Sequence, residues 1–555
     1  MTLLRPHQYG IALRGGLETL TTELSIDVDH TQADVVISLD AKNAFNTLSR
    51  TVIKQRIQEA NLVEFIPYMH CMYGTPSRLF CKGTGRNPLF SSTGVQQGDP
   101  LGPAAFCVGI HKTLAAVALQ HPDVRLYAYL DDIYVAGDMN SALTAVASLI
   151  SSLAEIGLVI NKAKSRVLRC HNVSLDDLRN QVAALTEDEP DEHGVVGDNH
   201  SLAICDDDLV IVCVPFGSAQ FKRDFLHKQV EEWSRQLVCL DHLSSTQYKS
   251  LLFRWCILSK ATFLMRNVSP SIAHPAWQAW DTILKTFISQ SLLGGVGEFS
   301  DHALLQLQLP VGKGGFGFNI PSMHAPAAYL AGFSLGLQSR GDSWDPEIWD
   351  APYQIFQDVL IAYSCHRHFC EASALLPSQF SVDWFALNKV DQRKLAQEVH
   401  VQIFNLYQQF APEIDKSRLR SLSDPNGHAG DWLLVTPTEA RLRLANEEFR
   451  FASKLRLGLP IAHLPDHCPC SHSNHESQID LGLGYHSLTC RHRRLTWFIP
   501  RHNWILSTWS RTLRLPAFLL MRSLKGCSLG VDLTMKFKMK LKLKMTMQIP
   551  TKRIS

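Results

Sequence analysis

Two adjacent aspartates, Asp131 and Asp132, are the residues of this 555-residue chain whose type and setting most directly suggest chemistry. Runs of aromatic and β-branched residues flank them, a pattern that predicts a β-hairpin with the two carboxylates at the tip of a two-residue turn. Adjacent carboxylates repel each other and are seldom assembled without a cation, so the pair suggests a magnesium platform. Asp also favours turns for structural reasons alone, and the hairpin by itself leaves both interpretations open.

A third carboxylate favours the chemical interpretation. Residues 34–40 predict a compact apolar strand closed by Asp40, and an apolar helical pattern follows from Leu48 to Ile57. A strand-end aspartate beside a hairpin-tip pair is the arrangement that two-metal phosphoryl transfer requires. Carboxylates fixed on rigid strands can bridge two cations, and these stabilise the attacking and leaving oxygens.

Three further segments accompany these carboxylates. Residues 94–103 form a Gly/Pro-rich loop that opens a long apolar helix pattern over 104–119. Such a loop lets a base pair or sugar approach the backbone closely, although an ordinary loop before a helix-starting proline has the same composition. After the hairpin, residues 142–156 predict an amphipathic helix ended by Gly157, and residues 158–165 predict a strand that carries lysines.

Composition is that of a globular protein with a real core and excludes general disorder, since 45% of the residues are hydrophobic. No apolar run reaches the length of a membrane span and the N-terminus lacks the apolar region of a signal peptide, so we expect an intracellular protein with no membrane partner. The net charge of +2 conceals an asymmetry, because residues 491–555 hold 15 of the 54 Lys and Arg and one of the 52 acidic residues. Nucleic-acid affinity would therefore depend on local basic surface and on this tail.

The order of these segments resembles that of motifs A, B, C and D of reverse transcriptases. Asp40 belongs to the first, Gln97-Gly98 to the second, Tyr129-Leu130-Asp131-Asp132 to the third, and residues 157–164 to the fourth. Four motifs in register over about 130 residues form a specific signal. The variant is similar to that of non-LTR, LINE-type retrotransposons, in which Leu-Asp-x-x-x-Ala-Phe, Gly-x-x-Gln-Gly-x-Pro-Leu-x-Pro and Gly-Leu-x-Ile-Asn-Lys recur.

The resemblance implies an α+β fold: a right-hand polymerase palm, built as an antiparallel sheet with flanking helices, with a helical thumb, a helical C-terminal extension and a small zinc-binding segment. It implies an RNA-directed DNA polymerase with an RNA template, a DNA primer and dNTPs as partners, and leaves the oligomeric state open. The expected divisions are the palm with a remnant of the fingers at 1–180, an acidic insertion at 181–210, the motif E hinge and thumb at 211–340, the helical extension at 341–465, the zinc segment at 466–505 and a basic low-complexity tail at 506–555.

The resemblance also assigns a metal site. Asp40, Asp131 and Asp132 are expected to hold two Mg²⁺ or Mn²⁺ ions, with the Ala41 carbonyl as an optional further ligand. Primer extension would then proceed by in-line attack of a 3′-hydroxyl on the α-phosphate of a dNTP.

Nucleotide-binding residues follow from the same motifs. Phe45, five residues after Asp40, falls on the steric gate where an aromatic ring excludes a 2′-OH and selects deoxynucleotides. Gln97 and Gly98 would line the nucleotide and template pocket. Lys164 matches the lysine proposed to protonate the leaving pyrophosphate, and a solvated strand lysine is the equal alternative.

Other segments indicate the organisation beyond the palm. Residues 187–208 form an acidic stretch that predicts an exposed insertion, and residues 212–218 resemble motif E, the hinge toward a thumb that grips the primer. Residues 221–291 are dominated by helical patterns. Residues 312–317 match the letters of a dinucleotide fingerprint, which we reject because no βαβ unit or ribose-binding acid accompanies them. Residues 439–459 predict an Arg- and Leu-rich helix that faces either a phosphate backbone or solvent.

A second metal site is predicted near the C-terminus. Cys468, Cys470, His486 and Cys490 form a Cys-x-Cys…His-x-x-x-Cys set of soft ligands, which indicates one structural Zn²⁺. The Gly-Tyr-His-Ser-Leu-Thr-Cys core of this segment resembles the C-terminal cysteine–histidine segment of many LINE-type proteins. The remaining cysteines are scattered, as expected for reduced thiols.

The N-terminal end leads to one more expectation. Only 39 residues precede Asp40, too few for the fingers that in this family supply basic residues to the incoming triphosphate, so we expect an N-terminally truncated copy. The alternative function is a catalytically inactive nucleic-acid-binding relic held by its zinc segment and basic tail. An active element would act in the nucleus, although no clear targeting signal is present.

Overall fold

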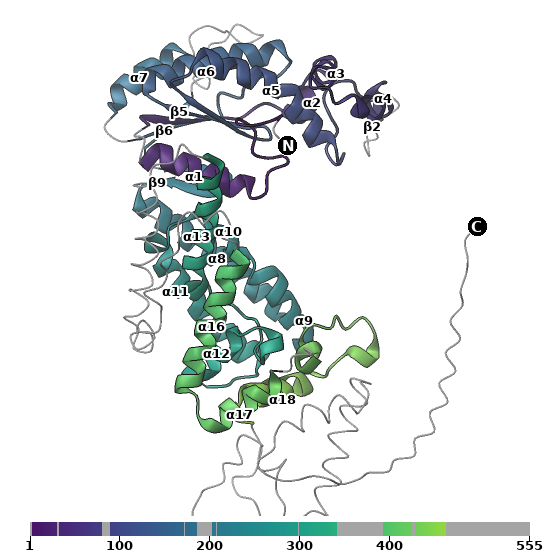
Figure 1. Ribbon diagram of the computed structural model, residues 1–555, viewed down its shortest axis with the longest axis vertical. Coiled ribbons are helices and arrows are strands. Elements are labelled where there is room, and N and C mark those ends of the chain that lie inside the picture. The colour runs from purple at the N-terminus through teal and green to yellow at the C-terminus, as the bar shows by residue number, and fades with distance from the viewer. Residues whose placement is uncertain are drawn as a thin grey trace, which may run out of the picture.

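The computed structural model describes most of the first 340 residues and two later segments (Figure 1). The predicted zinc ligands Cys468, Cys470, His486 and Cys490 and the basic tail lie outside the described residues, so these predictions stay predictions. The described residues are 3–29, 33–79, 89–170, 173–185, 202–206, 208–297, 299–340, 392–423 and 428–461.

A five-stranded sheet forms the centre of the palm. Its strand order is β4-β5-β1-β6-β7, and all neighbours are antiparallel except β6 and β7, which run parallel. The palm therefore has a mixed sheet, and our expectation of an antiparallel one was wrong at this edge. The strands are β1 (Val35–Leu39), β4 (Arg125–Tyr129), β5 (Asp132–Gly137), β6 (Arg166–Arg169) and β7 (Ala203–Asp206).

Helices cover both faces of the sheet. Figure 1 shows α5, α6 and α7 over one face and α1 against the other, while α2, α3 and α4 lie to one side with the β2–β3 hairpin. These palm elements are α1 (Gly16–Asp29), α2 (Ala44–Thr47), α3 (Arg50–Glu59), a 3₁₀ turn η1 (Val63–Phe65), α4 (Ile66–Tyr73), β2 (Ser77–Leu79), β3 (Leu89–Ser91), α5 (Gly102–Gln120), α6 (Met139–Glu155) and α7 (Leu175–Ala184).

The parallel strand β7 comes from the stretch that we predicted to be an exposed acidic insertion. Ile204 pairs with Val167 of β6, and the Asp206 carboxylate forms an ion pair with Arg169 at 2.6 Å. A parallel neighbour requires a crossover connection, and α7 lies in that connection. Part of the acidic stretch is therefore structural, because its apolar residues complete the edge of the sheet.

The period-two alternation of β1 explains the two covered faces. Val35, Ile37 and Leu39 are buried in an apolar cluster with residues of α5 and α6, whereas Val36 belongs to a second cluster with residues of α1. Successive side chains of a strand point to opposite faces of its sheet. A strand with apolar side chains on both faces must therefore be covered on both sides.

The core helix of the palm is α5. Among the described residues it alone has the length and apolar composition of a membrane-crossing segment, although we saw no apolar run of that length in the sequence. More than half of this stretch is buried. Phe106, Ile110 and Leu114 lie in the same cluster as the inward side chains of β1. Burial of this kind is typical of a core helix in a globular domain.

Beyond the palm a helical region extends away from the sheet (Figure 1). Trp233 and Trp277 stack with ring centroids 6.4 Å apart, and Trp280 lies 5.6 Å from Trp233. These indoles share an apolar cluster with Tyr127 and Tyr134 of the palm, so the two parts have a continuous core. The elements are β8 (Asp208–Ile211), β9 (Val214–Gly217), α8 (Ala219–Asp241), α9 (Thr246–Leu252), the π-helical turn η2 (Phe253–Ile257), α10 (Lys260–Asn267), α11 (Pro270–Phe287), the π-helical turn η3 (Ile288–Leu292), α12 (Asp301–Gln308), the 3₁₀ turn η4 (Val311–Lys313), α13 (Pro321–Arg340), α16 (Gln392–Phe410), α17 (Glu413–Leu422), the 3₁₀ turns η7 (His428–Leu433) and η8 (Ala440–Leu442), and α18 (Asn446–Leu457).

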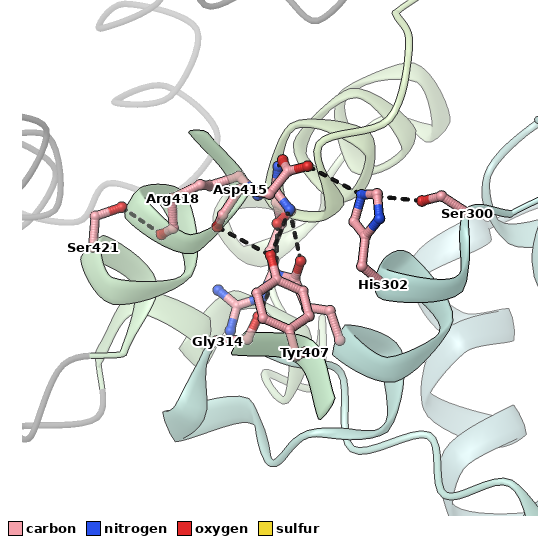
Figure 2. Close-up of polar contacts among 9 residues, drawn as sticks. Ser300, His302, Gly314, Tyr407, Asp415, Arg418 and Ser421 are labelled. Atoms are coloured by element: carbon pink, nitrogen blue, oxygen red, sulfur yellow. Dashed lines mark hydrogen bonds and ion pairs between the residues drawn. The ribbon is translucent and has the colours of Figure 1, made fainter. Parts of the chain in front are cut away.

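A buried polar network, which we call the Asp415 network, joins α12, α16 and α17 (Figure 2). Asp415 and Arg418 of α17 are only 5% and 6% exposed, and they form an ion pair. His302 Nε2 contacts the second carboxylate oxygen of Asp415 at 3.0 Å. Arg418 Nη2 also donates to Gln306 Oε1 at 2.8 Å and to the Tyr407 hydroxyl at 3.3 Å. Every charge in this network therefore has a partner of opposite sign or a hydrogen-bond acceptor.

Arg456 of α18 extends the same network. Its guanidinium is buried and donates to the carbonyl oxygens of Val311, Gly315 and Ala429 at 2.8, 3.1 and 3.0 Å. Residues 311–313 form a 3₁₀ turn and not a phosphate-binding loop, which agrees with rejection of the dinucleotide fingerprint. For Arg456 the expectation of a phosphate-facing or solvent-facing side chain was wrong, because the carbonyls of this turn require buried donors.

Candidate active site

The register of β1 against β5 brings Asp40 to the hairpin. Leu39 pairs with Ile133, so the next position along each strand places Asp40 opposite Asp132. Both residues continue the alternation that faces α1, and both side chains leave the sheet on the side away from α5 and α6. The Cβ atoms of directly opposed residues lie roughly 4.5–5.5 Å apart in an antiparallel pair. The sheet thus gathers carboxylates that are about ninety positions apart in the sequence.

The hairpin turn lies one residue earlier than we expected. Tyr129 pairs with Asp132, so Leu130 and Asp131 form the two-residue turn and Asp132 is the first residue of β5. Leu130 has φ 59°, a left-handed conformation that is unfavourable for leucine. The side chain of Gln8 bonds both the N–H and the C=O of Leu130, at 2.7 and 3.1 Å. This contact accounts for the shifted turn.

Burial and neighbouring negative charge raise the pKa of two of the three carboxyl groups. Burial raises the pKa of Asp132 to about 6, and the negative charges of Asp131 and Asp40 add to that rise. Burial also raises the pKa of Asp131, again with a contribution from Asp40. Within the described part of the chain, no basic side chain forms an ion pair with any of the three. The site is an uncompensated concentration of negative charge, a property that clusters at functional sites.

The donors in this group fit a divalent cation. Carboxylate oxygens are the ligands that Mg²⁺ prefers, and a cation relieves the repulsion among like charges. No three His, Cys, Asp or Glu side chains in the described residues already converge on one centre. Rotation about side-chain torsions is enough to turn opposed carboxylates toward each other, because the backbone already places them across one strand pair.

Two residues of the loop at 158–165 hold the backbone of Asp40. The Asp40 N–H donates to Ser165 Oγ at 3.1 Å, and the Asp40 carbonyl accepts from the Asn161 N–H at 2.7 Å. Ser165 is fully buried, and its hydroxyl donates onward to the Asn161 carbonyl at 2.9 Å. These bonds fix the backbone from which the Asp40 carboxylate projects.

This loop replaces the strand that we predicted at 158–165, so that prediction was wrong. Only Ile160 forms a bridge, to Ala41, and β6 begins at Arg166. The physical reason is that the N–H groups of Lys164 and Ser165 both bond back to the Asn161 carbonyl, which curls the chain into a turn. Lys164 is exposed on that turn.

Phe45 and the Gly/Pro-rich loop form one unit. The Phe45 ring lies 4.7 Å from the ring of Phe106 in α5, centroid to centroid. The Phe45 carbonyl accepts from the Val95 N–H at 2.6 Å, which attaches α2 to the loop that carries Gln97 and Gly98. Both loop residues are exposed, and Gly98 has φ 94°, a conformation that favours glycine. The loop therefore presents open backbone beside the aromatic ring.

Asp99 in this loop is a buried carboxylate that the sequence did not single out. It accepts hydrogen bonds from the hydroxyls of Tyr68 and Tyr73 and from the Leu101 N–H. Tyr73 also accepts from the Gln96 N–H at 3.1 Å. Burial by itself would raise the pKa of Asp99, but these hydrogen bonds outweigh burial and lower it. Asp99 therefore anchors the loop and does not extend the group of three carboxylates.

The β8–β9 hairpin lies near the carboxylates, on the side of the sheet where the helical region begins. Its two turn residues, Val212 and Cys213, both have positive φ. Tyr134, two residues after Asp132 on the same face of β5, is buried, and burial and the charge of Asp132 raise its pKa. Val212 supplies a backbone hydrogen bond to the Tyr134 hydroxyl. The segment that resembles motif E thus borders the same face as Asp40.

Three anchoring residues were missed by reasoning from sequence. Gln8 bonds a residue 122 positions away, Ser165 one 125 positions away, and Asp99 two tyrosines 31 and 26 positions away. Contacts at such separations follow no local period. Only Asp99 had a signal in the sequence, as the single charged residue of the Gly/Pro-rich loop at 94–103.

Comparison with known proteins identifies the family of the N-terminal part of the chain. A family model described as reverse transcriptase (RNA-dependent DNA polymerase) matches residues 1–194. The retrotransposable element SLACS 132 kDa protein of Trypanosoma brucei gambiense is 24% identical over 308 residues, which are 54% of this chain and 24% of that protein. The Gag-Pol polyprotein of avian reticuloendotheliosis virus is 31% identical over 84 residues, 15% of this chain and 7% of that protein. The chain thus spans about a quarter or less of the length of these curated relatives.

Two solved telomerase structures, each in complex with a TWJ fragment of telomeric RNA, are also similar in part. The telomerase of Candida tropicalis matches with a TM-score of 0.29 and 14% identity, over 62% of this chain and 53% of that one. The telomerase of Candida albicans matches with a TM-score of 0.27 and 13% identity, over 68% and 56%.

The family-model match covers all four motifs, from Asp40 to Lys164, and the trypanosome relative is a retrotransposon protein. Together they confirm the resemblance that the motifs carried. Residues 1–194 contain a reverse transcriptase domain, and over 308 residues the chain is similar to a retrotransposable-element protein.

Proposed function

We propose that this chain is an RNA-directed DNA polymerase that adds dNTPs to the 3′-hydroxyl of a DNA primer on an RNA template. The observation that carries the proposal is the cluster of Asp40, Asp131 and Asp132, in which two carboxylates have raised pKa values and none has a cationic partner among the described residues. A fold that assembles such repulsion without compensation is poised to bind cations. The motif order and the family match support the reaction class.

In this proposal the three aspartates hold the divalent ions. Asp40 contributes from the end of β1, Asp131 from the turn and Asp132 from the start of β5. Bound Mg²⁺ or Mn²⁺ would supply charge neutralisation and activation of the attacking hydroxyl. The Ala41 carbonyl, next to Asp40 in the chain, is a candidate further ligand. The protein contributes rigidity, because strands fix these groups within one sheet.

The neighbouring groups would select and orient the nucleotide. The Phe45 ring, backed by Phe106, occupies the position proposed to exclude a 2′-hydroxyl. Gln97 and Gly98 offer exposed side chain and backbone to the base pair. Lys164, exposed on the loop that holds Asp40, is the proposed proton donor to pyrophosphate.

Nucleic acid would lie against the face of the sheet that carries the carboxylates. The β8–β9 hairpin borders that face, and the helical region continues from β9 through α8. This placement is consistent with a primer-gripping hairpin at the base of a thumb. The four predicted zinc ligands lie outside the described residues, and a metal analysis of protein purified without chelator tests for one Zn²⁺ per chain.

Primer extension with the purified chain tests the polymerase proposal. Poly(rA)·oligo(dT) with dTTP and Mg²⁺ should yield extended primer, whereas omission of the template or addition of EDTA should abolish the product. Binding of the primer–template should persist in EDTA, since phosphate contacts do not require the palm metals. Tight binding without any extension under all metal conditions would instead favour a nucleic-acid-binding relic.

A further inference from the structure

Residues 7–9 extend the palm sheet along the outer edge of β4. The Tyr9 N–H donates to the Ala128 carbonyl at 2.8 Å, the Ala128 N–H donates to the His7 carbonyl at 2.7 Å, and Gln8 bridges Ala128 in parallel. The Tyr9 hydroxyl donates to Glu23 of α1 at 2.9 Å. This short segment is therefore fixed both to the hairpin strand and to the helix beneath it.

The side chain of Gln8 reaches from this segment to the hairpin turn. It is fully buried, and its Oε1 accepts from the N–H groups of Leu130 and Gly10 at 2.7 and 3.0 Å. Its Nε2 donates to the Leu130 carbonyl at 3.1 Å. A primary amide is a neutral side chain that can satisfy an N–H and a C=O of one residue at the same time. A hydrocarbon satisfies neither, and a carboxylate satisfies only the N–H.

The clamped residue is the one whose backbone the turn strains. Leu130 has positive φ at the first of the two turn positions, where type II′ hairpins favour glycine. A leucine persists in that conformation only when its surroundings hold it. Fixing both polar groups of Leu130 also fixes the peptide plane that leads into Asp131. The direction in which Asp131 and Asp132 project then depends on a residue more than 120 positions earlier.

We propose that Gln8 is a positioning residue for the three aspartates. Its amide holds Leu130 in the left-handed conformation, so that Asp131 and Asp132 are aligned with Asp40 for divalent-cation binding. This inference rests on the proposed function, because the alignment matters only where the carboxylates bind metal. Gln8 touches no reacting group and acts through Leu130. Residues that orient metal ligands in this way commonly change metal affinity about 10- to 100-fold when mutated.

Mn²⁺ binding to the full-length chain, measured by electron paramagnetic resonance of the free ion, tests the inference without reference to polymerisation. Gln8→Leu should weaken binding at the carboxylate site about 10- to 100-fold relative to the parent. Gln8→Glu, which keeps the acceptor for the Leu130 N–H, should still weaken it. Leu130→Gly in the Gln8→Leu background should restore affinity, because glycine adopts the turn conformation without a clamp.

The thumb supplies a matched control. Gln247 is also buried and bonds backbone groups of two residues through its amide, with Nε2 donating to the Leu442 carbonyl at 3.1 Å and Oε1 accepting from the Leu444 N–H at 3.0 Å. Gln247→Leu should lower stability in urea while leaving Mn²⁺ binding unchanged. Equal losses of Mn²⁺ affinity in Gln8→Leu and Gln247→Leu would overturn the inference, since Gln8 would then act through general stability alone.

Asp131→Asn distinguishes failure of the positioning inference from failure of the proposed function. If Asp131→Asn loses Mn²⁺ binding and both Gln8 variants bind like the parent, the positioning inference is overturned and the proposed function stands. If Asp131→Asn itself binds Mn²⁺ like the parent, the proposed function fails and the inference fails with it. Selective loss in Asp131→Asn and Gln8→Leu, with rescue by Leu130→Gly, supports both.

Discussion

The three aspartates of the palm and the Asp415 network of the helical region differ in how their buried charges are compensated. In the palm, burial and mutual repulsion raise the pKa of Asp131 and of Asp132, and no described basic side chain compensates them. Around Asp415, burial would also raise the pKa of the carboxyl, but the hydrogen bond from His302 and the charge of Arg418 outweigh burial and lower it. Similar residue types therefore have opposite electrostatic settings in one chain.

The difference separates a functional site from a structural one. A compensated network stabilises the fold only while all its members are present, and removing one partner leaves a buried charge alone. An uncompensated group costs stability in the free protein and retains its capacity to bind an external cation. The contrast predicts opposite consequences for substitutions in the two regions.

The largest effect is expected at the palm. Asp131→Asn removes one charge and keeps the shape, and it should lower the primer-extension rate by about 10²–10³ or more, comparable to the loss of a principal transition-state stabiliser. Single-turnover extension on poly(rA)·oligo(dT) measures this loss. Asp123→Asn, an exposed aspartate in the loop before β4, is the matched control and should extend at the parent rate. Equal rates for all three proteins would remove the catalytic assignment.

Substitutions in the Asp415 network should change the free energy of unfolding and not the rate of primer extension. Arg418→Met leaves Asp415 buried without its main cation and should cost about 3–5 kcal/mol of unfolding free energy. Urea denaturation followed by tryptophan fluorescence measures the cost. Arg420→Met on the same helix removes an exposed arginine and should change stability by less than about 0.5 kcal/mol. A similar small change in both variants would show that the network is not structurally important.

Sugar selection should depend on the aromatic ring beside the carboxylates. Phe45→Ala opens the space that we assign to the excluded 2′-hydroxyl, and the preference for dNTP over rNTP should fall roughly 10- to 200-fold, the range by which a pocket discriminates between ligands that differ by one small group. Phe90→Ala removes an exposed aromatic of β3 and serves as the control. The ratio of dNTP to rNTP incorporation rates tests this prediction. An unchanged ratio would show that Phe45 does not select the sugar.

The smallest effect is expected in the pH dependence of stability. Because the pKa of Asp132 is raised to about 6 in the folded chain, its contribution to the free energy of unfolding falls as pH rises from about 4 to about 6. In metal-free buffer at pH 7, Asp132→Asn should therefore raise Tm by about 2–4 °C. The gain should vanish below about pH 4, where the carboxyl is protonated in both states.

The corresponding substitution at Asp415 should have the opposite sign. Its pKa is lowered in the folded chain, so its contribution to stability is present above its ordinary pKa and is lost as pH falls. Asp415→Asn should therefore lower Tm at pH 7. Thermal scans of both variants across pH 4–7 measure the two Tm shifts. Shifts of the same sign at pH 7 would contradict the opposite electrostatic settings of Asp132 and Asp415.

Local sequence pattern determined the family, the three carboxylates and most of the elements that carry them. The apolar strand before Asp40, the helix over α5 and the hairpin around Asp131 each have a period or a flanking composition that is fixed by neighbouring residues. Backbone propensity and alternation act over a few positions, so a single sequence is enough to predict them. The order of the four motifs was specific for the same reason, since each is a short string.

How those elements are held together depends on contacts between residues far apart in the sequence. The turn at Leu130 lies one residue earlier than expected, where the side chain of Gln8 bonds it from the N-terminal segment. The loop at 158–165 is curled where it bonds the backbone of Asp40. β7 joined the sheet in parallel, and Arg456 turned inward to the carbonyls of a 3₁₀ turn. In each case a polar group found its partner far away in the sequence. The need to satisfy buried hydrogen-bonding groups overrode the local pattern, and no local pattern encodes which distant group will be there.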